Sequence, residues 1–202
     1  MRRVIHYLLA IALSILTLPI VFLASITVFA CYPCNPFLLQ KRKGKGNLVF
    51  TIIKLRTLRK DNQEPIRLCG GFMRKTKIDE LPQFWNVVIG DMALVGPRAT
   101  IVEWAELFSD QFKHLGYDIR FSVLPGVTGL AQIRGQPHDL PGNIQAVISD
   151  LEFIERMKEN WLGLDLQILT LTMIYLFRSV LRKEKKAESR ISEGKLVSLT
   201  NL

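Results

Sequence analysis

The sequence predicts an α+β protein that is attached to a membrane, and three observations support this prediction. Residues 4–30 contain no Asp, Glu, Lys or Arg, and a run of this length is sufficient to cross a bilayer. Residues 48–55 have the β-branched composition of a strand, and residues 81–88 have the apolar spacing of a helix. The 202 residues carry a net charge of +9 with a mean hydropathy of +0.20. A chain that is both basic and apolar suits an anionic lipid surface better than nucleic acid.

We divide the chain into a membrane helix over 1–34, a globular domain over 35–182 and a disordered tail over 183–202. The apolar N-terminal segment has three interpretations: a spanning helix, a helix that re-enters on the same face, and a secretion signal. Pro19 lies near its middle, where a proline removes a backbone hydrogen bond and bends a helix. Basic residues lie on both sides of the segment, and only the re-entrant form keeps both groups in the cytoplasm.

The first part of the globular domain is predicted to form a hairpin. Residues 44–47 have the composition of a tight loop, and a strand follows over 48–55. Lys54 and Arg56 lie two positions apart, so both side chains project from the same face of an extended segment. Residues 59–71 are expected to form a loop.

The second part contains an amphipathic helix that begins after two acids. Leu81, Phe84, Trp85 and Val88 share one helical face, Pro82 suits the first turn, and Gly90 is expected to end the helix. Asp79 and Glu80 would then lie at the N-terminus, where the helix dipole favours negative charge. The remaining predictions are a short strand at 94–95, helix over 100–120, a turn and an extended piece over 125–132, and helix over 151–160.

Two further segments keep alternative interpretations. Residues 167–177 carry no charge and are too short to cross a membrane, so they form either a helix in the membrane interface or a core helix. Cys31, Cys34 and Cys69 do not form a disulfide framework. We expect free thiols in a reducing compartment, with a zinc or redox site as the alternative.

The acid pair Asp79-Glu80 has a structural and a chemical interpretation. Two solvated acids at a helix start are common. However, the cationic residues nearby in the sequence are able to converge on this end of the helix: Lys54, Arg56, Arg74 and Arg98. A carboxylate attacks phosphorus only when the charges of attacker and target are offset, and Mg²⁺ with arginine forks provides that offset. We expect the dipole and the cations to keep Asp79 ionised.

These residues occur together with a series of motifs in fixed order, so the chain resembles the bacterial sugar transferases, the monotopic phosphoglycosyl transferases. The resemblance runs from the N-terminus to about residue 178. The matching segments are Pro19, the 50–57 segment, Arg74, Asp79-Glu80-Leu-Pro-Gln, Asn86-Val, Gly90-Asp-Met, Leu-Val-Gly96-Pro97-Arg98, the 125–132 segment, Asp150-x-x-Phe153 and Leu164-Asp165-Leu.

The resemblance implies a re-entrant N-terminal helix broken at Pro19, a small catalytic domain built on a β-hairpin with associated helices, and amphipathic helices in the interface. It implies transfer of a sugar phosphate from a nucleoside diphosphate sugar, usually a UDP-sugar, to polyprenol phosphate at the cytoplasmic face of the bacterial inner membrane. UMP leaves, a phosphosugar-aspartate forms, and Mg²⁺ is required. The implied nucleophile and metal contact is Asp79, with Glu80 as its partner. The implied substrate-binding residues are Lys54, Arg56, Arg74, Gly96, Pro97, Arg98, Arg134, Gln136 and Asp165.

Some features depart from the family pattern or leave alternatives. Leu18 stands where the family often has Ser, so the break would depend on Pro19 and nearby hydroxyls. Gln136 stands where many members have an arginine, and Arg134 is a candidate replacement. No extra multi-helix region precedes the motifs, as in the minimal catalytic form, and a homodimer is possible. The competing hypotheses are a membrane-anchored adaptor and a nucleic-acid binder, and the latter lacks a recognisable module.

Overall fold

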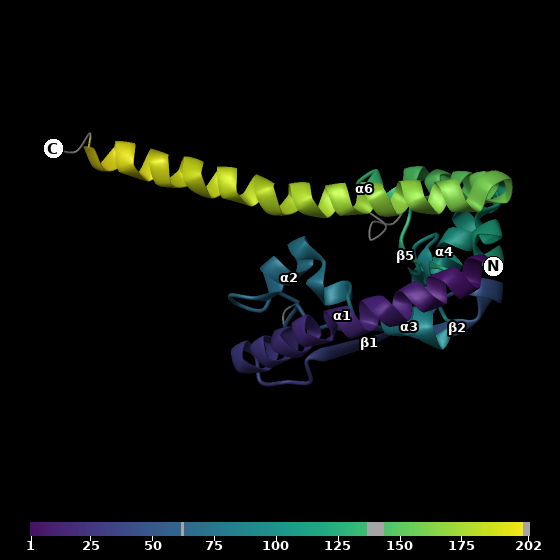
Figure 1. Cartoon of the computed structure of the whole chain (residues 1–202), viewed down its shortest axis with the longest axis horizontal. Helices are drawn as coiled ribbons and strands as arrows, with labels where there is room; N and C mark the ends of the chain where they lie inside the picture. Colours follow the sequence, from purple (N-terminus) through teal and green to yellow (C-terminus); the bar gives the residue numbers. More distant parts are fainter. Residues whose placement is uncertain (62, 137–143, 200–202) are drawn as a thin grey trace.

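The computed structural model describes residues 1–61, 63–136 and 144–199, with side chains up to Arg178. Two long helices, α1 and α6, flank a small body of strands and short helices (Figure 1). In chain order the elements are α1 (Arg2–Cys31), β1 (Phe37–Lys43), η1 (Lys45–Asn47), β2 (Val49–Leu55), α2 (Gly70–Thr76), η2 (Ile78–Glu80), α3 (Gln83–Ile89), β3 (Ala93–Val95), β4 (Thr100–Ile101), α4 (Val102–Gln111), η3 (Lys113–Leu115), η4 (Tyr117–Ser122), β5 (Gly126–Thr128), α5 (Leu130–Ile133) and α6 (Ile144–Leu199). The α+β class is confirmed.

The predicted hairpin is present. Strands β1 and β2 pair antiparallel from Phe37 with Leu55 to Lys43 with Val49, and β4 adds to the other edge of β1. The turn over 44–47 contains Gly46 and Asn47 with φ values of 67° and 62°, which a tight reversal requires.

The side chain of Asn86 on α3 serves as a partner for the outer edge of β2. Its Oδ1 accepts a hydrogen bond from the backbone N–H of Ile53 at 3.0 Å, and its Nδ2 donates to the carbonyl of Thr51 at 2.7 Å. A strand edge would otherwise leave these two backbone groups unpaired. This buried amide therefore fixes the helix that follows the acid pair against the strand that carries Lys54.

A second, parallel sheet pairs β3 with β5, so the predicted strand at 94–95 is confirmed. Two other predictions are only partly right. Within 125–132, β5 is extended but α5 is helical, and within 100–120 the α-helix ends at Gln111 and continues as 3-10 turns. The positive φ of 73° at Gly116 separates those turns, and a helix cannot continue through it.

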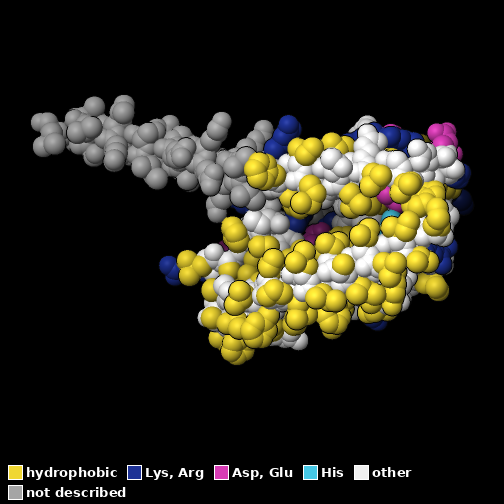
Figure 2. Space-filling model, in the orientation of Figure 1, with side chains coloured by type: hydrophobic (Ala, Val, Ile, Leu, Met, Phe, Trp, Pro, Cys, Tyr) yellow, Lys and Arg dark blue, Asp and Glu magenta, His cyan; other side chains and the backbone are white. Residues whose placement is uncertain are grey.

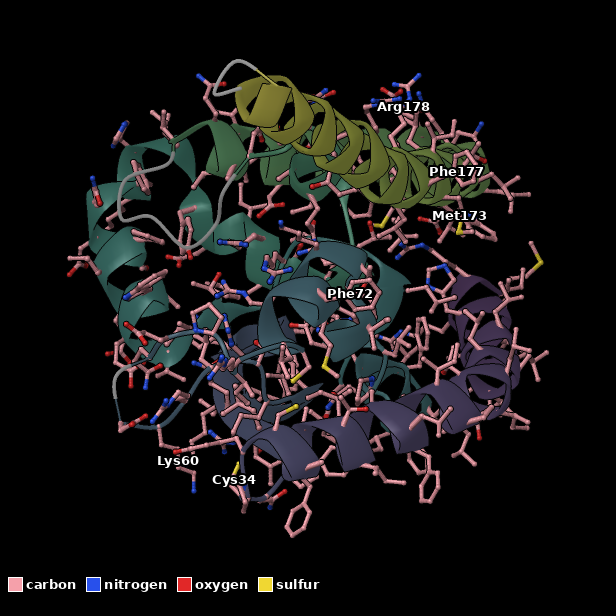
Figure 3. All side chains as sticks on the ribbon, turned by 90° about the vertical axis from the view of Figure 1, so that its left-hand side faces the viewer. Cys34, Lys60, Phe72, Met173, Phe177 and Arg178 are labelled. Carbon is pink, nitrogen blue, oxygen red and sulfur yellow. The ribbon has the colours of Figure 1, made fainter. Side chains whose placement is uncertain are left out.

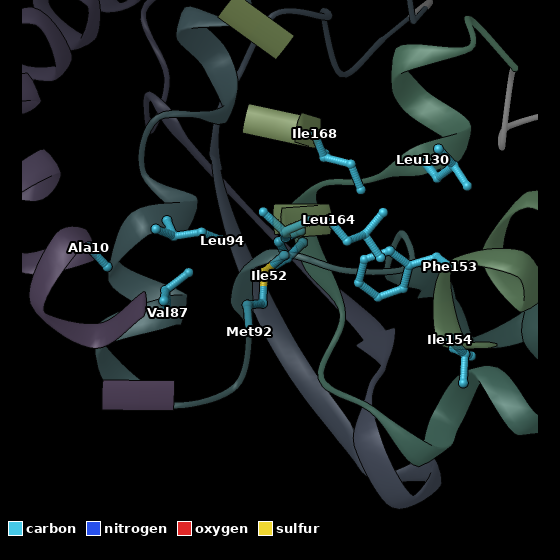
Figure 4. Close-up of a cluster of buried hydrophobic side chains, with 11 residues drawn as sticks. Ala10, Ile52, Val87, Met92, Leu94, Leu130, Phe153, Ile154, Leu164 and Ile168 are labelled. Carbon is cyan, nitrogen blue, oxygen red and sulfur yellow. The ribbon is translucent and has the colours of Figure 1, made fainter. Parts of the chain in front are cut away.

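The main hydrophobic core joins both long helices to the body. It contains Ala10, Ile52, Val87, Met92, Leu94, Val95, Leu130, Phe153, Ile154, Leu164 and Ile168 (Figure 4). A second cluster packs the C-terminal end of α1 against β2 and α2, with Val28, Leu55, Cys69 and Met73 among its members. Helix α1 therefore contacts the same body near both of its ends.

Helix α1 is continuous for 30 residues with Pro19 inside it. Figure 3 shows that it changes direction along its length, as a proline in its interior predicts. The hydroxyl of Thr17 donates to the carbonyl of Leu13 at 2.7 Å, one turn back. The backbone thus bends without a gap in the helix, in contrast to the predicted break. By length and composition, α1 and the 144–178 part of α6 are each apolar enough to cross a membrane.

Helix α6 has a kink at Asn160, whose φ and ψ of −148° and 81° are not helical. Beyond the kink only one face is buried, at Leu164 and Ile168, while Leu166, Met173 and Phe177 are more than half exposed. The core-helix alternative for 167–177 is therefore wrong for most of that segment. The structure describes no side chains beyond Arg178, so the predicted disorder of residues 183–202 stays a prediction.

Candidate active site

The acid pair lies in a buried turn between α2 and α3. Asp79 and Glu80 belong to the 3-10 turn η2, one turn before α3 begins at Gln83. Lys77 precedes them with a left-handed backbone at a φ of 60°, which reverses the chain after α2. Asp79 is 8% exposed and Glu80 is 9% exposed. The interpretation as two solvated acids at a helix start is therefore wrong.

Glu80 is held by three cations. Its Oε1 lies 3.3 Å from Lys54 Nζ, 3.2 Å from an Arg98 guanidinium nitrogen and 3.8 Å from Lys77 Nζ. Burial alone would raise the pKa of Glu80, but the charges of Arg98, Lys54 and Lys77 outweigh it and hold the pKa well below its usual range. Burial lowers the pKa of Lys54, and the Glu80 charge opposes that shift. Glu80 is thus a fixed anion that organises the cations.

Asp79 differs from its neighbour because one carboxylate oxygen is unused. Its Oδ1 is buried and has no hydrogen-bond partner among the described residues. Burial and the adjacent Glu80 charge raise the pKa of Asp79 to about 6, although Lys54 and Lys77 oppose the shift. The direction of this shift is opposite to the one that the helix dipole and the cations alone would produce, since desolvation is the larger effect. At pH 7 and above, Asp79 is still mostly ionised, and its Oδ1 forms no hydrogen bond with any described residue.

The Gly96-Pro97-Arg98 loop is fixed by very close backbone packing. A Cβ atom on Gly126 would lie 2.1 Å from the Gly96 nitrogen, and one on Gly129 would lie 2.1 Å from the Gly96 oxygen. The Pro97 carbonyl accepts a hydrogen bond from Gly126 N–H at 2.8 Å. Both glycine motifs of the sequence therefore serve one purpose, which is to place the Arg98 backbone beside the acid pair.

A buried ion pair that the sequence did not indicate supports the same loop. Arg120 donates to the Arg98 carbonyl at 2.8 Å and to Asp150 Oδ2 at 2.6 Å, and its guanidinium lies 4.9 Å from the ring centre of Tyr117. Arg120 and Asp150 are 5% and 1% exposed. By charge alone Arg120 resembles the other 26 basic residues, and only its place shortly before Pro125-Gly126 could have distinguished it.

The predicted convergence of cations is seen for Lys54 and Arg98 and does not extend to Arg56 and Arg74. Arg56 donates to the carbonyl of Asn35 at 3.1 Å, beyond the end of β2. Arg74 is exposed on α2 and makes no hydrogen bond or ion pair within the part of the chain that the structure describes. Substrate binding by these two arginines stays a prediction.

Three other predicted site residues lie in separate contacts. Asp165 on α6 binds Arg2 at 2.7 Å and His6 at 2.9 Å, so it joins the N-terminus of α1 to α6. Arg134 forms a bidentate ion pair with Glu152. The Oε1 atom of Gln136 is buried and has no hydrogen-bond partner among the described residues. Their contacts to a nucleotide or sugar stay predictions.

The residues present fit a magnesium ion at Asp79. Mg²⁺ is commonly held by one or two carboxylates, with water and substrate phosphate completing its six ligands. The unpaired Oδ1 of Asp79 supplies such a donor, whereas Glu80 is already engaged by cations. Among the described residues no group of three or more His, Cys, Asp or Glu side chains forms a complete cage, and Cys31, Cys34 and Cys69 are free thiols.

Comparison with known proteins points to one family. The family model described as "Bacterial sugar transferase" matches residues 1–179. A UDP-glucose:undecaprenyl-phosphate glucose-1-phosphate transferase of Caulobacter vibrioides is 35% identical over 66% of this chain and 54% of its own. The Escherichia coli protein of the same name is 31% identical over 86% of this chain and 39% of its own. An uncharacterized sugar transferase of Bacillus subtilis, EpsL, is 35% identical over 68% and 67%.

The chain thus spans about half or less of the length of the first two of these relatives. The match nevertheless covers all the described elements from α1 to the middle of α6, including the acid pair and the Arg98 loop. The chain belongs to the bacterial sugar transferase family.

Proposed function

We propose that this chain transfers a sugar 1-phosphate from a nucleoside diphosphate sugar to polyprenol phosphate. The observation that carries the proposal is the asymmetry of the acid pair. Glu80 is locked by three cations, while Asp79 keeps a buried, unpaired oxygen next to the same positive charge. Relatives named as UDP-glucose and UDP-N-acetylgalactosamine phosphotransferases support a UDP-sugar as donor.

The reaction proceeds in two displacements at phosphorus. Asp79 Oδ1 attacks the β-phosphorus of the UDP-sugar, the bond to the bridging oxygen breaks, and UMP leaves with that electron pair. A phosphosugar is then attached to Asp79 as an acyl phosphate. A phosphate oxygen of polyprenol phosphate attacks the same phosphorus, the bond to Asp79 breaks, and the carboxylate is regenerated with the polyprenol diphosphate sugar as product.

Each residue of the site has a role in these steps. Arg98 and Lys54 stabilise the negative charge that accumulates on the phosphoryl oxygens. Glu80 holds both cations in place, and Arg120 holds the Arg98 backbone. A magnesium ion at Asp79 would offset the charge of the diphosphate when bound. The partial burial of the acid pair keeps water from competing for the acyl phosphate.

We place the chain on the cytoplasmic face of the inner membrane, and the packing of α1 supports a monotopic attachment. Helix α1 packs on the body near both of its ends. If the exposed face of α1 is inserted into a bilayer, both ends of the helix therefore remain on the side of the body. That face exposes Leu8, Ile15, Leu16, Phe22 and Leu23. Figure 2 shows α1 and α6 as two apolar ridges on either side of a hollow in which charged side chains are visible. In Figure 3, Met173 and Phe177 point toward the side on which α1 lies.

The decisive experiment is self-labelling. Purified full chain with Mg²⁺ and a UDP-sugar labelled at the β-phosphate should release UMP and carry the label, and added polyprenol phosphate should remove it. Asp79→Asn should do neither, whereas Asp110→Asn, which changes an exposed acid on α4, should behave as the parent protein. Normal UMP release by Asp79→Asn would refute the mechanism.

Topology is tested separately, in a cysteine-free background. Single cysteines at positions 3 and 60 should both be protected from a membrane-impermeant reagent added to intact cells. Reaction at position 3 but not at position 60 would show that α1 crosses the membrane.

A further inference from the structure

A groove of about 590 Å³ lies at the N-terminal end of α1, away from the acid pair. Its walls come from the first two turns of α1, from α3 and the residues after it, from residues 122–124 at the end of η4, and from α6 around its kink. Figure 1 shows the N-terminus of α1 close to this end of α6. Neither Asp79 nor Glu80 lines the groove. Its volume lies in the range of sites that hold a ligand of drug size.

The floor of the groove is apolar. Val87, Met92, Val123, Leu124, Met157 and Trp161 line it. Side chains of this kind retain an aliphatic chain rather than a free inorganic anion. Val4 also lines the groove, and it is exposed one turn before Leu8, the first residue of the face of α1 that we place at the membrane.

The rim of the groove is cationic and carries no acid. Arg2, Arg3 and Lys45 line it, and no Asp or Glu does. Arg2 is already used, since it binds Asp165 and the carbonyl of Val95. Arg3 and Lys45 are exposed and form no ion pair with any described residue. Two unpaired cations at the edge of an apolar groove are complementary to a phosphate joined to an acyl chain.

We propose that this groove binds an anionic glycerophospholipid of the host membrane as a non-reacting ligand. The phosphate lies between Arg3 and Lys45, and one acyl chain covers Met92, Leu124 and Trp161. The bound lipid fixes the start of α1 against α6 and holds the body at a set depth on an anionic bilayer. This inference does not depend on the proposed reaction, because the site shares no residue with the acid pair.

The test uses Trp161 as the reporter. In a Trp85→Phe, Trp104→Phe background, the full chain in neutral detergent micelles is titrated with phosphatidylglycerol whose acyl chains carry bromine, which quenches nearby tryptophan. Brominated phosphatidylcholine and brominated-chain polyprenol phosphate are titrated in parallel. Arg3→Gln with Lys45→Gln removes the rim charges, and Lys41→Gln with Lys60→Gln is the matched control for net charge.

Phosphatidylglycerol should quench Trp161 at lower mole fraction than phosphatidylcholine. Removal of the rim charges should weaken that preference by about 25-fold, at about fivefold for each charge, and the control pair should retain it. Equal quenching by the two phospholipids, or an unchanged preference after rim neutralisation, would overturn the proposal. Stronger quenching by polyprenol phosphate than by phosphatidylglycerol would also overturn it, because the groove would then belong to the acceptor.

Discussion

Neutralising the two adjacent carboxylates should change the free energy of unfolding in opposite directions. Burial raises the pKa of Asp79 from 3.8 to about 6, so its ionised form destabilises the fold at neutral pH. The shift of about 2 units corresponds to about 3 kcal/mol at 1.36 kcal/mol per unit. This cost is fully present above pH 6, declines as the pH falls toward 4, and is absent below the unfolded-state pKa. Asp79→Asn should therefore stabilise the protein at pH 7.5 while it abolishes self-labelling.

Glu80→Gln should do the reverse. The pKa of Glu80 is lowered, so its contribution to stability is present above the unfolded-state pKa of 4.5 and is lost only in stronger acid. Removing its charge takes the Glu80 carboxylate away from the partly buried cations Lys54 and Arg98, and breaking a buried ion pair typically costs about 3–5 kcal/mol. Exposure is small at both acids, so solvent screening does not remove either effect.

The assay is thermal unfolding in detergent without Mg²⁺, which would otherwise stabilise ionised Asp79. For a chain of this size 1 kcal/mol shifts Tm by roughly 2–4 °C. Asp79→Asn should raise Tm by roughly 6 °C or more at pH 7.5 and leave it nearly unchanged at pH 4, and Glu80→Gln should lower it at pH 7.5. Asp110→Asn, at an exposed acid, is the control. An Asp79→Asn protein that is no more stable at pH 7.5 than the parent would refute the electrostatic account.

Three further predictions concern the support of the site. Gly126→Ala should abolish activity and lower Tm, since its Cβ would lie 2.1 Å from the Gly96 nitrogen; circular dichroism and UMP release measure both effects. Asn86→Leu should lower the free energy of unfolding by about 2 kcal/mol or more, because two backbone groups of β2 lose their partner. It should also accelerate amide hydrogen exchange at Ile53 relative to the centre of β1. Asp165→Asn should release the first turns of α1 and speed tryptic cleavage after Arg3, whereas equal cleavage rates would show that this ion pair does not hold the helix.

Local sequence predicted the elements whose cause is local. The run without charge predicted α1, and the turn residues at 44–47 predicted the hairpin. Likewise, Gly90, with a φ of 98°, ended α3 as expected. The sequence also predicted that Arg98 converges on the acid pair, and the contact between Arg98 and Glu80 confirms this. The glycines at 126 and 129 lie against the backbone of the same loop, where only glycine fits.

Tertiary structure decided the properties that depend on neighbours far along the chain. Whether the pKa of a carboxyl rises or falls depends on how deeply it is buried and on which cations reach it. The sequence therefore could not show that the pKa of Asp79 rises while that of Glu80 falls. For the same reason the sequence did not indicate the role of Arg120, which depends on its contacts with Arg98 and Asp150. Nor did it indicate the groove that Arg3 and Lys45 line. Residue type sets what a side chain is able to do, but desolvation and pairing are properties of the packed neighbourhood.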